Sequence, residues 1–136
     1  MTDRRVVRDG TSATLETAFA ITGKMDGSAA ENYKVPAKAK RLIAIEVVIA
    51  AESLAAVQEN AYGLRLQGDG LPGGPWFFIL GGHSSGTTST SGMVVPVTRI
   101  PVDLPVVQNG SIDADGFPVG DTIIVAAVMV ALVFEE

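Results

Sequence analysis

Apolar and polar positions alternate along much of the chain, which is the pattern of β-strands. The clearest example is residues 42–50 (LIAIEVVIA), in which positions 43, 45, 47 and 49 share one face and positions 42, 44, 46 and 48 share the other. Both faces are mostly apolar, which predicts a strand that is buried on both sides. Residues 122–134 are also apolar on both faces, and their Ile and Val content favours a strand over a helix.

The same alternation predicts shorter strands elsewhere. They cover residues 14–22, the stretch around Tyr62, Leu64 and Leu66, and the aromatic stretch 76–80 (WFFIL). Residues 51–60 contain helix-favouring residues over fewer than three turns, so they predict a short helix or an ordered loop. Residues 108–110 (QNG) predict a turn, and the stretches 81–92 and 113–121 predict loops.

Residues 93–107 carry a specific prediction about their position in a sheet. One apolar face is formed by Ile100, Val102, Leu104 and Val106. Pro101 and Pro105 lack a backbone N–H, and residues four apart in a strand point this group to the same side. The sequence therefore predicts an edge strand or a bulged one, protected against further pairing.

Together these stretches predict an all-β protein. We expect an antiparallel β-sandwich, jelly-roll-like, with six to eight strands and little helix. A parallel sheet would need crossover helices, and no stretch is long enough to supply them. Residues 1–13 are polar and lack periodicity, so they predict an N-terminal arm, and residues 14–136 predict a single β-sandwich domain.

The charge is distributed unevenly. Residues 1–41 contain eight Lys and Arg against five Asp and Glu, whereas residues 42–136 contain two against ten, and the net charge is −5. Nucleic-acid binding needs clustered cations, so we expect no nucleic-acid partner. Two interpretations of the basic front stay open: it lies on an acidic neighbour, or it is a solvated tail.

The apolar run at residues 123–134 is shorter than the roughly twenty residues of a membrane-spanning helix. The first residues also lack the apolar stretch of a signal peptide. We therefore expect no membrane partner and a soluble protein that is made and assembled without secretion.

Two stretches match the motifs of known functional sites, but neither is followed by the residue or element that its motif requires. Residues 82–86 match G-x-S-x-G, but the chain has one histidine, His83, and the nucleophile elbow needs a histidine after Ser84. Residues 68–73 match G-x-G-x-x-G, but a strand-like stretch follows where a dinucleotide site needs a helix. The chain has no cysteine. We therefore expect no enzyme, no catalytic residue and no cofactor.

The residue chemistry offers two candidate binding sites. Asp113, Asp115 and Asp121 could bind Ca²⁺ through oxygen ligands, but their spacing is not that of an EF-hand and turn carboxylates explain them better, so no metal is expected. A carbohydrate could stack on Trp76 beside the loop at residues 81–92. This ligand-binding module is the alternative function, although aromatic residues in an alternating strand are more often part of the core.

Several segments together resemble small jelly-roll or β-sandwich proteins of virus particles, the decoration (cement) and minor capsid proteins of phages and archaeal viruses. These segments are the charged start with Arg4, Arg5 and Arg8, LIAIEVVIA, YGLRLQGDGLPGG leading into WFFIL, MVVPVTRIPVDLPV and TIIVAAVMVALVFEE. The resemblance implies a structural protein of the virion, assembled in the host cytoplasm. It also implies a symmetric homo-oligomer, commonly a trimer, that docks on a capsid shell protein through loops or an arm. The short chain favours an accessory role over a shell-forming one.

The sequence predicts self-association independently of this resemblance. A small domain with two strands that are apolar on both faces has more apolar surface than one core hides, and surplus apolar surface marks an interface. We expect a homo-oligomer whose contact uses the last strand, through its opposite face or through Ile124, Val128, Val130 and Leu132.

Overall fold

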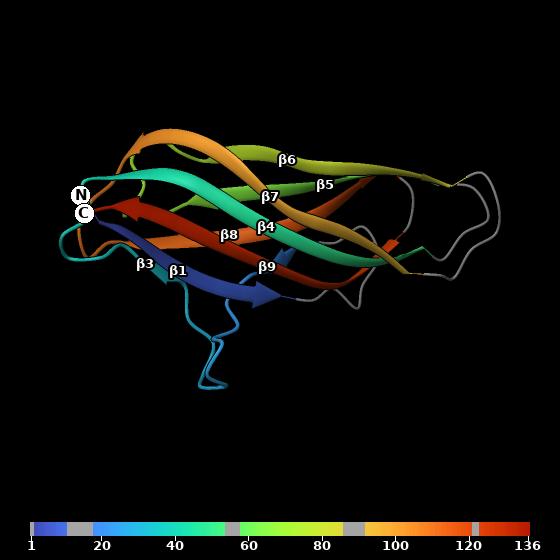
Figure 1. The fold of residues 1–136 in the computed structure, drawn as a ribbon, viewed down its shortest axis with the longest axis horizontal. Helices are drawn as coiled ribbons and strands as arrows, with labels where there is room; N and C mark the ends of the chain where they lie inside the picture. The colour runs from blue at the N-terminus through green and yellow to red at the C-terminus, as the bar shows by residue number, and fades with distance from the viewer. Residues whose placement is uncertain (1, 11–17, 54–57, 86–91, 121–122) are drawn as a thin grey trace.

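A computed structural model gives the fold and describes residues 2–10, 18–53, 58–85, 92–120 and 123–136. Within these ranges, the side chains of residues 49–62, 80–97 and 118–127 are not described. The described residues form nine β-strands and no helix (Figure 1). The strands are β1 (Asp3–Gly10), β2 (Phe19–Ala20), β3 (Tyr33–Lys34), β4 (Arg41–Ser53), β5 (Gln58–Gln67), β6 (Trp76–Ser85), β7 (Gly92–Pro105), β8 (Ser111–Gly120) and β9 (Ile123–Glu135).

The strands form two antiparallel sheets that pack face to face. Sheet 1 has the order β1-β9-β4-β7, and sheet 2 has the order β2-β8-β5-β6, with β3 also pairing with β8. The chain crosses repeatedly from one sheet to the other, and only β5 and β6 are sequence neighbours that pair. This is the strand order of a jelly roll. The all-β antiparallel sandwich is therefore confirmed, and the strand number exceeds the expected six to eight because β1, β2 and β3 add pairing at the edges.

The core lies between the inner faces of the two sheets. Alternate residues of each strand point into it, as a half-buried strand requires. Sheet 1 contributes side chains of β4 and β9, and sheet 2 contributes side chains of β5 and β8. The largest of these buried residues are Leu42, Ile45, Leu132, Phe134, Leu64, Leu66 and Ile112.

A bulge changes which residues of β4 reach the core. The alternation in residues 42–50 places Leu42 and Ile45 on opposite faces, yet both are fully buried in the core. The pairing register of β4 with β9 shifts between Leu42 and Ala44, so Ile43 is an extra residue of β4 with respect to β9. In the pairing with β7, the extra residue at this place lies on β7. Such an insertion reverses the phase of a strand, and alternation alone does not reveal it.

The prediction for residues 93–107 is confirmed. β7 pairs with β4 alone and forms an edge of sheet 1. Its register shifts at two places, so it is also bulged. The apolar side chains of Ile100, Val102, Leu104 and Val106 pack against the core. Pro101 and Pro105 are exposed on the opposite face, and their missing N–H groups are tolerated because β7 is an edge strand.

Three predictions about local structure are corrected. Residues 3–10 are not an arm but strand β1, which pairs with β9 over its whole length. The described parts of residues 51–60 continue β4 and begin β5, so they are not a helix. Residues 113–120 belong to β8 and not to a loop, because the inward positions Ile112, Ala114 and Gly116 alternate with outward aspartates.

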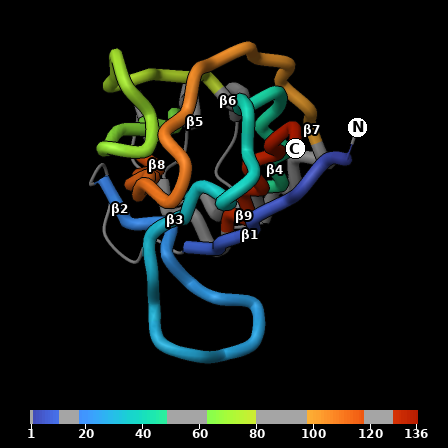
Figure 2. The backbone as a smooth tube through the Cα atoms, turned by 90° about the vertical axis from the view of Figure 1, so that its left-hand side faces the viewer, coloured from blue at the N-terminus to red at the C-terminus, as the bar shows by residue number. Residues whose placement is uncertain are grey.

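The two chain ends lie together at one end of the sandwich, as Figure 1 shows. At this end Glu136 donates its backbone N–H to the carbonyl of Thr2 at 2.8 Å. The segment between β2 and β3 leaves the sandwich and returns as a protruding loop (Figure 2). A hydrogen bond from Gly27 to the carbonyl of Lys24 (3.0 Å) and an ion pair of Lys24 with Glu31 (3.2 Å) hold this loop in shape.

Candidate functional site

The outer face of sheet 1 presents a charged row beside an apolar hollow. Glu46 on β4 accepts a hydrogen bond from Arg5 on β1 at 2.7 Å and one from Arg99 on β7 at 3.2 Å. The carboxylate thus links three strands of the sheet. Next to it lies a hollow of about 190 Å³, lined by Val7, Glu46, Val47, Val48, Met129 and Ala131.

The two arginines hold the pKa of Glu46 below its ordinary value of 4.5, chiefly through the hydrogen bond from Arg5. The folded chain therefore favours the charged carboxylate more than the unfolded chain does. The resulting stabilisation is present above pH 4.5 and is lost as the pH falls through the lower value of the folded state.

We therefore expect Glu46→Gln to lower the free energy of unfolding at pH 7 by less than about 1 kcal/mol, as for a partly exposed ion pair. The difference between the variant and the wild type should shrink at pH 3, where the wild type has also lost the charge. Urea denaturation at both pH values measures this. Asp103→Asn, which removes a more exposed carboxylate from the same sheet, is the control. A difference that is equal or larger at pH 3 would contradict the assignment.

The arginines predicted to make arm contacts find their described partners within the chain. Arg4 pairs with Glu136 at 3.1 Å, and Arg5 pairs with Glu46. Arg8 donates to the carbonyl of Glu31 at 3.1 Å. Arg4 and Arg5 therefore contact carboxylates of residues 42–136 of the same chain, and Arg8 contacts Glu31 within residues 1–41.

The residues predicted for a subunit interface divide into two groups. Val128, Val130 and Leu132 are buried in the core and face sheet 2, so their side chains do not reach a partner in this fold. The side chain of Ile124 lies outside the described residues. The opposite face of β9 is the one that reaches the surface, where Met129 is exposed. The prediction of an interface is therefore corrected at the three buried positions, because the core uses them.

The outer face of sheet 2 carries the most exposed large apolar side chains of the described strands. Ile79 is 81% exposed and Phe77 is 63% exposed, both on β6. In the pairing register Ile79 lies opposite Gly63 of β5, which in turn lies opposite Phe117 of β8. A Cβ atom on Gly63 would come within 2.4 Å of the Phe117 ring, so that ring covers the glycine. Ile79 therefore has no cross-strand side chain beside it on β5.

An ion pair forms the neighbouring row on the same face. Arg65 of β5 lies opposite Phe77 on one side and Asp115 of β8 on the other. Arg65 and Asp115 bind each other at 2.7 Å. The two charges cancel, so the row next to β6 is electrically neutral.

The candidate metal ligands are not assembled into a site by the described structure. Asp115 is engaged by Arg65, and Asp113 lies opposite Gln67. Asp121 lies outside the described residues. Among the residues that are described, no group of three His, Cys, Asp or Glu side chains is close enough to hold a metal ion.

Trp76 faces the core, unlike Phe77. Its register partner is the buried Leu66, and its half-buried ring packs against the core cluster. The Nε1 atom of Trp76 is buried and has no hydrogen-bond partner in the protein. A sugar platform built on Trp76 is therefore not supported. The side chains of His83 and Ser84 lie outside the described residues, although their backbone continues β6.

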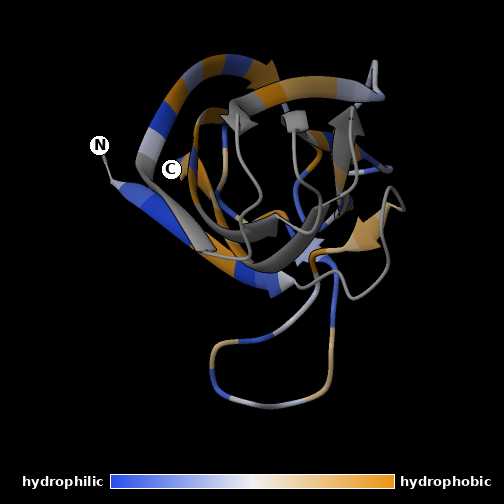
Figure 3. Ribbon diagram, turned by 90° about the vertical axis from the view of Figure 1, so that its right-hand side faces the viewer, coloured by the Kyte–Doolittle hydropathy of each residue, from blue (hydrophilic) through white to orange (hydrophobic). Residues whose placement is uncertain are grey.

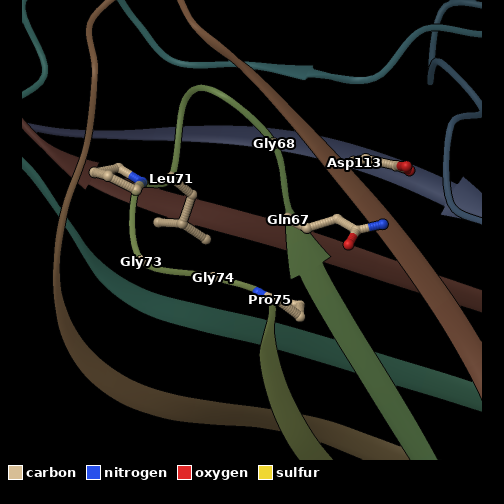
Figure 4. A pocket seen from close by; sticks show the side chains of 8 residues that line it. Gln67, Gly68, Leu71, Gly73, Gly74, Pro75 and Asp113 are labelled. Atoms are coloured by element: carbon tan, nitrogen blue, oxygen red, sulfur yellow. The ribbon is translucent and has the colours of Figure 1, made fainter.

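The glycine-rich loop before β6 borders a hollow of about 490 Å³ (Figure 4). Its lining is mainly glycine and proline backbone, and Gly74–Pro75 is a cis peptide bond. Gln67 and Asp113 are the polar side chains in the lining. Among the described residues, Asp113 is the one titratable side chain of this lining.

Sequence reasoning missed the exposed pair Phe77 and Ile79 because it treated the aromatic stretch as core. The alternation in WFFIL does contain the signal, since positions 77 and 79 are out of phase with positions 76 and 78. A strand of an outer sheet layer has one face on the core, so two of these side chains had to point outward.

The comparisons with known proteins give no family. No family model matches the chain, and no curated protein matches it. Among solved structures, the chain is similar to one described as the structure of infectious bursal disease virus Gx strain, with a TM-score of 0.41 and 14% sequence identity. The match covers 95% of this chain and 32% of that chain, so the chain spans about a third of its length.

The described residues contain no helix that is long and apolar enough to cross a membrane.

Proposed function

We propose that this chain is a structural protein of a virus particle that decorates or stabilises the capsid as a symmetric homo-oligomer bound to the shell protein. The proposed role requires a rigid domain whose outer surface binds other protein subunits. It does not require a catalytic group. The jelly-roll strand order supports it, since this fold is frequent in capsid proteins, although lectins and cupins share it.

The observation that carries the proposal is the exposure of Phe77 and Ile79 on the outer face of sheet 2. Side chains of this size are costly to leave in water, and a neighbouring pair on a flat sheet is typical of a contact surface. Both residues lie on a paired strand, so the surface is rigid before a partner binds. The charged side chains of the described ion pairs, by contrast, already have partners within the chain. Apolar contact is therefore the main driving force that we expect for assembly.

Two measurements test this function. Cell material that naturally produces the protein is separated on a density gradient, and we expect the chain to sediment with nuclease-resistant particles. Mass photometry of the purified chain at micromolar concentration should show a discrete oligomer. Absence from the particle fractions would refute the virion role, and a monomer throughout the concentration range would refute the homo-oligomer.

A further inference from the structure

The free edge of β6 differs from the other edges of the two sheets. Among the described strands β6 pairs with β5 alone, so its other side lies at the edge of sheet 2. The edge strand β1 has five charged residues in its sequence DRRVVRDG, and β7 contains three prolines. Strands β2 and β3 are two residues long each. Charges, prolines and short edge strands are the means by which proteins prevent pairing with another chain.

β6 has none of these three protections, although one bulge interrupts it. Its sequence, WFFILGGHSS, contains no proline and no Asp, Glu, Lys or Arg. Leu80 is skipped in the register with β5, because Ile79 lies opposite Gly63 and Gly81 lies opposite Tyr62. The bulge interrupts regular pairing at Leu80. The regular and unprotected part of the edge is therefore residues 76–79, the same part that carries the two exposed side chains.

The outward side chains of this segment face an apolar or a neutral row on the β5 side. Ile79 lies beside Gly63, which the Phe117 ring of β8 covers, and Phe77 lies beside Arg65, whose charge Asp115 neutralises. A strand added at the free edge would place side chains next to both residues at the usual cross-strand spacing. It would also pair the backbone groups of the edge.

We propose that residues 76–79 of β6 pair antiparallel with the same segment of a second copy, with Phe78 on the twofold axis and Phe77 of one copy opposite Ile79 of the other, so that the two copies of sheet 2 form one continuous sheet. Identical surfaces that meet across a twofold axis pair strands antiparallel, and each copy supplies the same patch. Phe77 and Ile79 of the two copies then become neighbours on the shared outer face. The proposed contact rests on the proposed function in one respect: it names the surface through which the homo-oligomer forms.

The charge distribution favours this edge as the meeting point of two copies. Each copy carries a net charge of −5, so copies repel each other at long range. β6 has no formally charged residue at neutral pH with its histidine neutral, and the nearest described pair, Arg65 and Asp115, sums to zero. Approach through β6 therefore brings no charged residues of that strand together, whereas the edge strand β1 carries arginines and aspartates.

The test compares Ile79→Lys with two matched controls. Met25 and Val107 are also exposed apolar residues, at 57% and 49%, but they lie outside β6. Met25→Lys and Val107→Lys therefore make the same chemical change elsewhere. Sedimentation equilibrium of the wild type should give a dimer as the smallest assembled unit. Ile79→Lys should raise the dissociation constant about a hundredfold, because both Phe77–Ile79 contacts are lost and two ammonium groups are placed on the same shared face.

Hydrogen exchange of the full chain distinguishes pairing at the edge from contact through the sheet face. In the wild type, amide exchange in residues 76–79 should slow as the concentration rises through the dissociation constant, and this slowing should disappear in Ile79→Lys. Thermal unfolding checks that each variant remains folded.

Each outcome decides the proposal. A dimer that is weakened by Ile79→Lys alone and protects residues 76–79 supports it. A trimer, a dimer that Ile79→Lys leaves intact, or a dimer without protection of these amides overturns the β6 contact and leaves the homo-oligomeric function standing. A wild type that stays monomeric overturns both the contact and the homo-oligomer.

Discussion

Replacing Tyr33 by alanine is expected to lower the free energy of unfolding by about 3–5 kcal/mol, the usual cost of deleting a fully buried aromatic ring. Tyr33 lies on β3 in sheet 2 and is completely buried. Its hydroxyl donates a hydrogen bond of 2.5 Å to the carbonyl of Val130 on β9 in sheet 1. The guanidinium of Arg8 on β1 lies 5.7 Å from the ring centroid. One side chain thus holds the short strand β3 against two strands of the opposite sheet.

Urea denaturation measures the loss, and Tyr33→Phe is the matched control. Phenylalanine keeps the ring and its contact with Arg8 but removes the hydroxyl, so we expect a loss of about 0.5–1.5 kcal/mol. Burial raises the pKa of Tyr33 far above its ordinary value, so the hydroxyl remains a donor at any pH of practical interest. Equal effects of the two substitutions would show that the ring itself contributes little, which would refute this account of the core.

Gly110→Ala is expected to destabilise the fold by about 3 kcal/mol, at the upper end of the usual cost of overpacking. A Cβ atom at this position would lie 2.5 Å from the Cα of Gly70 and 2.9 Å from the carbonyl oxygen of Val107. These are backbone atoms, so no rotamer change relieves the contact. The segments around Gly70 and Gly110 pass close to each other here. Hydrogen bonds from the N–H of Gly70 to the carbonyl of Ser111 (2.9 Å) and from the N–H of Val35 to the carbonyl of Gly110 (2.9 Å) stabilise this arrangement.

Thermal or urea unfolding compares this variant with Gly27→Ala. Gly27 has a φ of +79°, but nothing lies within 4 Å of its would-be Cβ atom, so its substitution costs only the backbone strain, about 1–2 kcal/mol. The larger loss at Gly110 would identify close backbone contact as its cause. If Gly110→Ala proved as stable as the wild type, the two loops would not cross as closely as the structure has them.

The sequence predicted the strands that have apolar residues on their inner face. β4, β5 and β9 lie where alternation placed them, and Pro101 and Pro105 correctly assigned β7 to an edge. These features are local: burial of every second side chain and a missing N–H follow from the residue types. Figure 3 shows the hydropathy along the described strands, with the mostly hydrophilic β1 beginning at the N-terminal label.

Where the sequence failed, the stabilising partner lies far away along the chain. Asp113 and Asp115 favour a turn locally, but they lie in a strand because Arg65 neutralises Asp115 and the intervening Ala114 fills the core. Residues 3–10 show no periodicity because Arg4 and Arg8 occupy inward positions. Arg8 is accommodated there by the ring of Tyr33 and the carbonyl of Glu31.

The sequence by itself determined the all-β class, the positions of the apolar strands and the protected edge of β7. Each of these depends on the chemistry of neighbouring positions. Only the tertiary structure decided which apolar side chains are left uncovered. Val128, Val130 and Leu132 are enclosed by the second sheet, while Phe77 and Ile79 face solvent. The reason is that exposure depends on register and on what the other sheet covers, and both are set by contacts between residues distant in sequence.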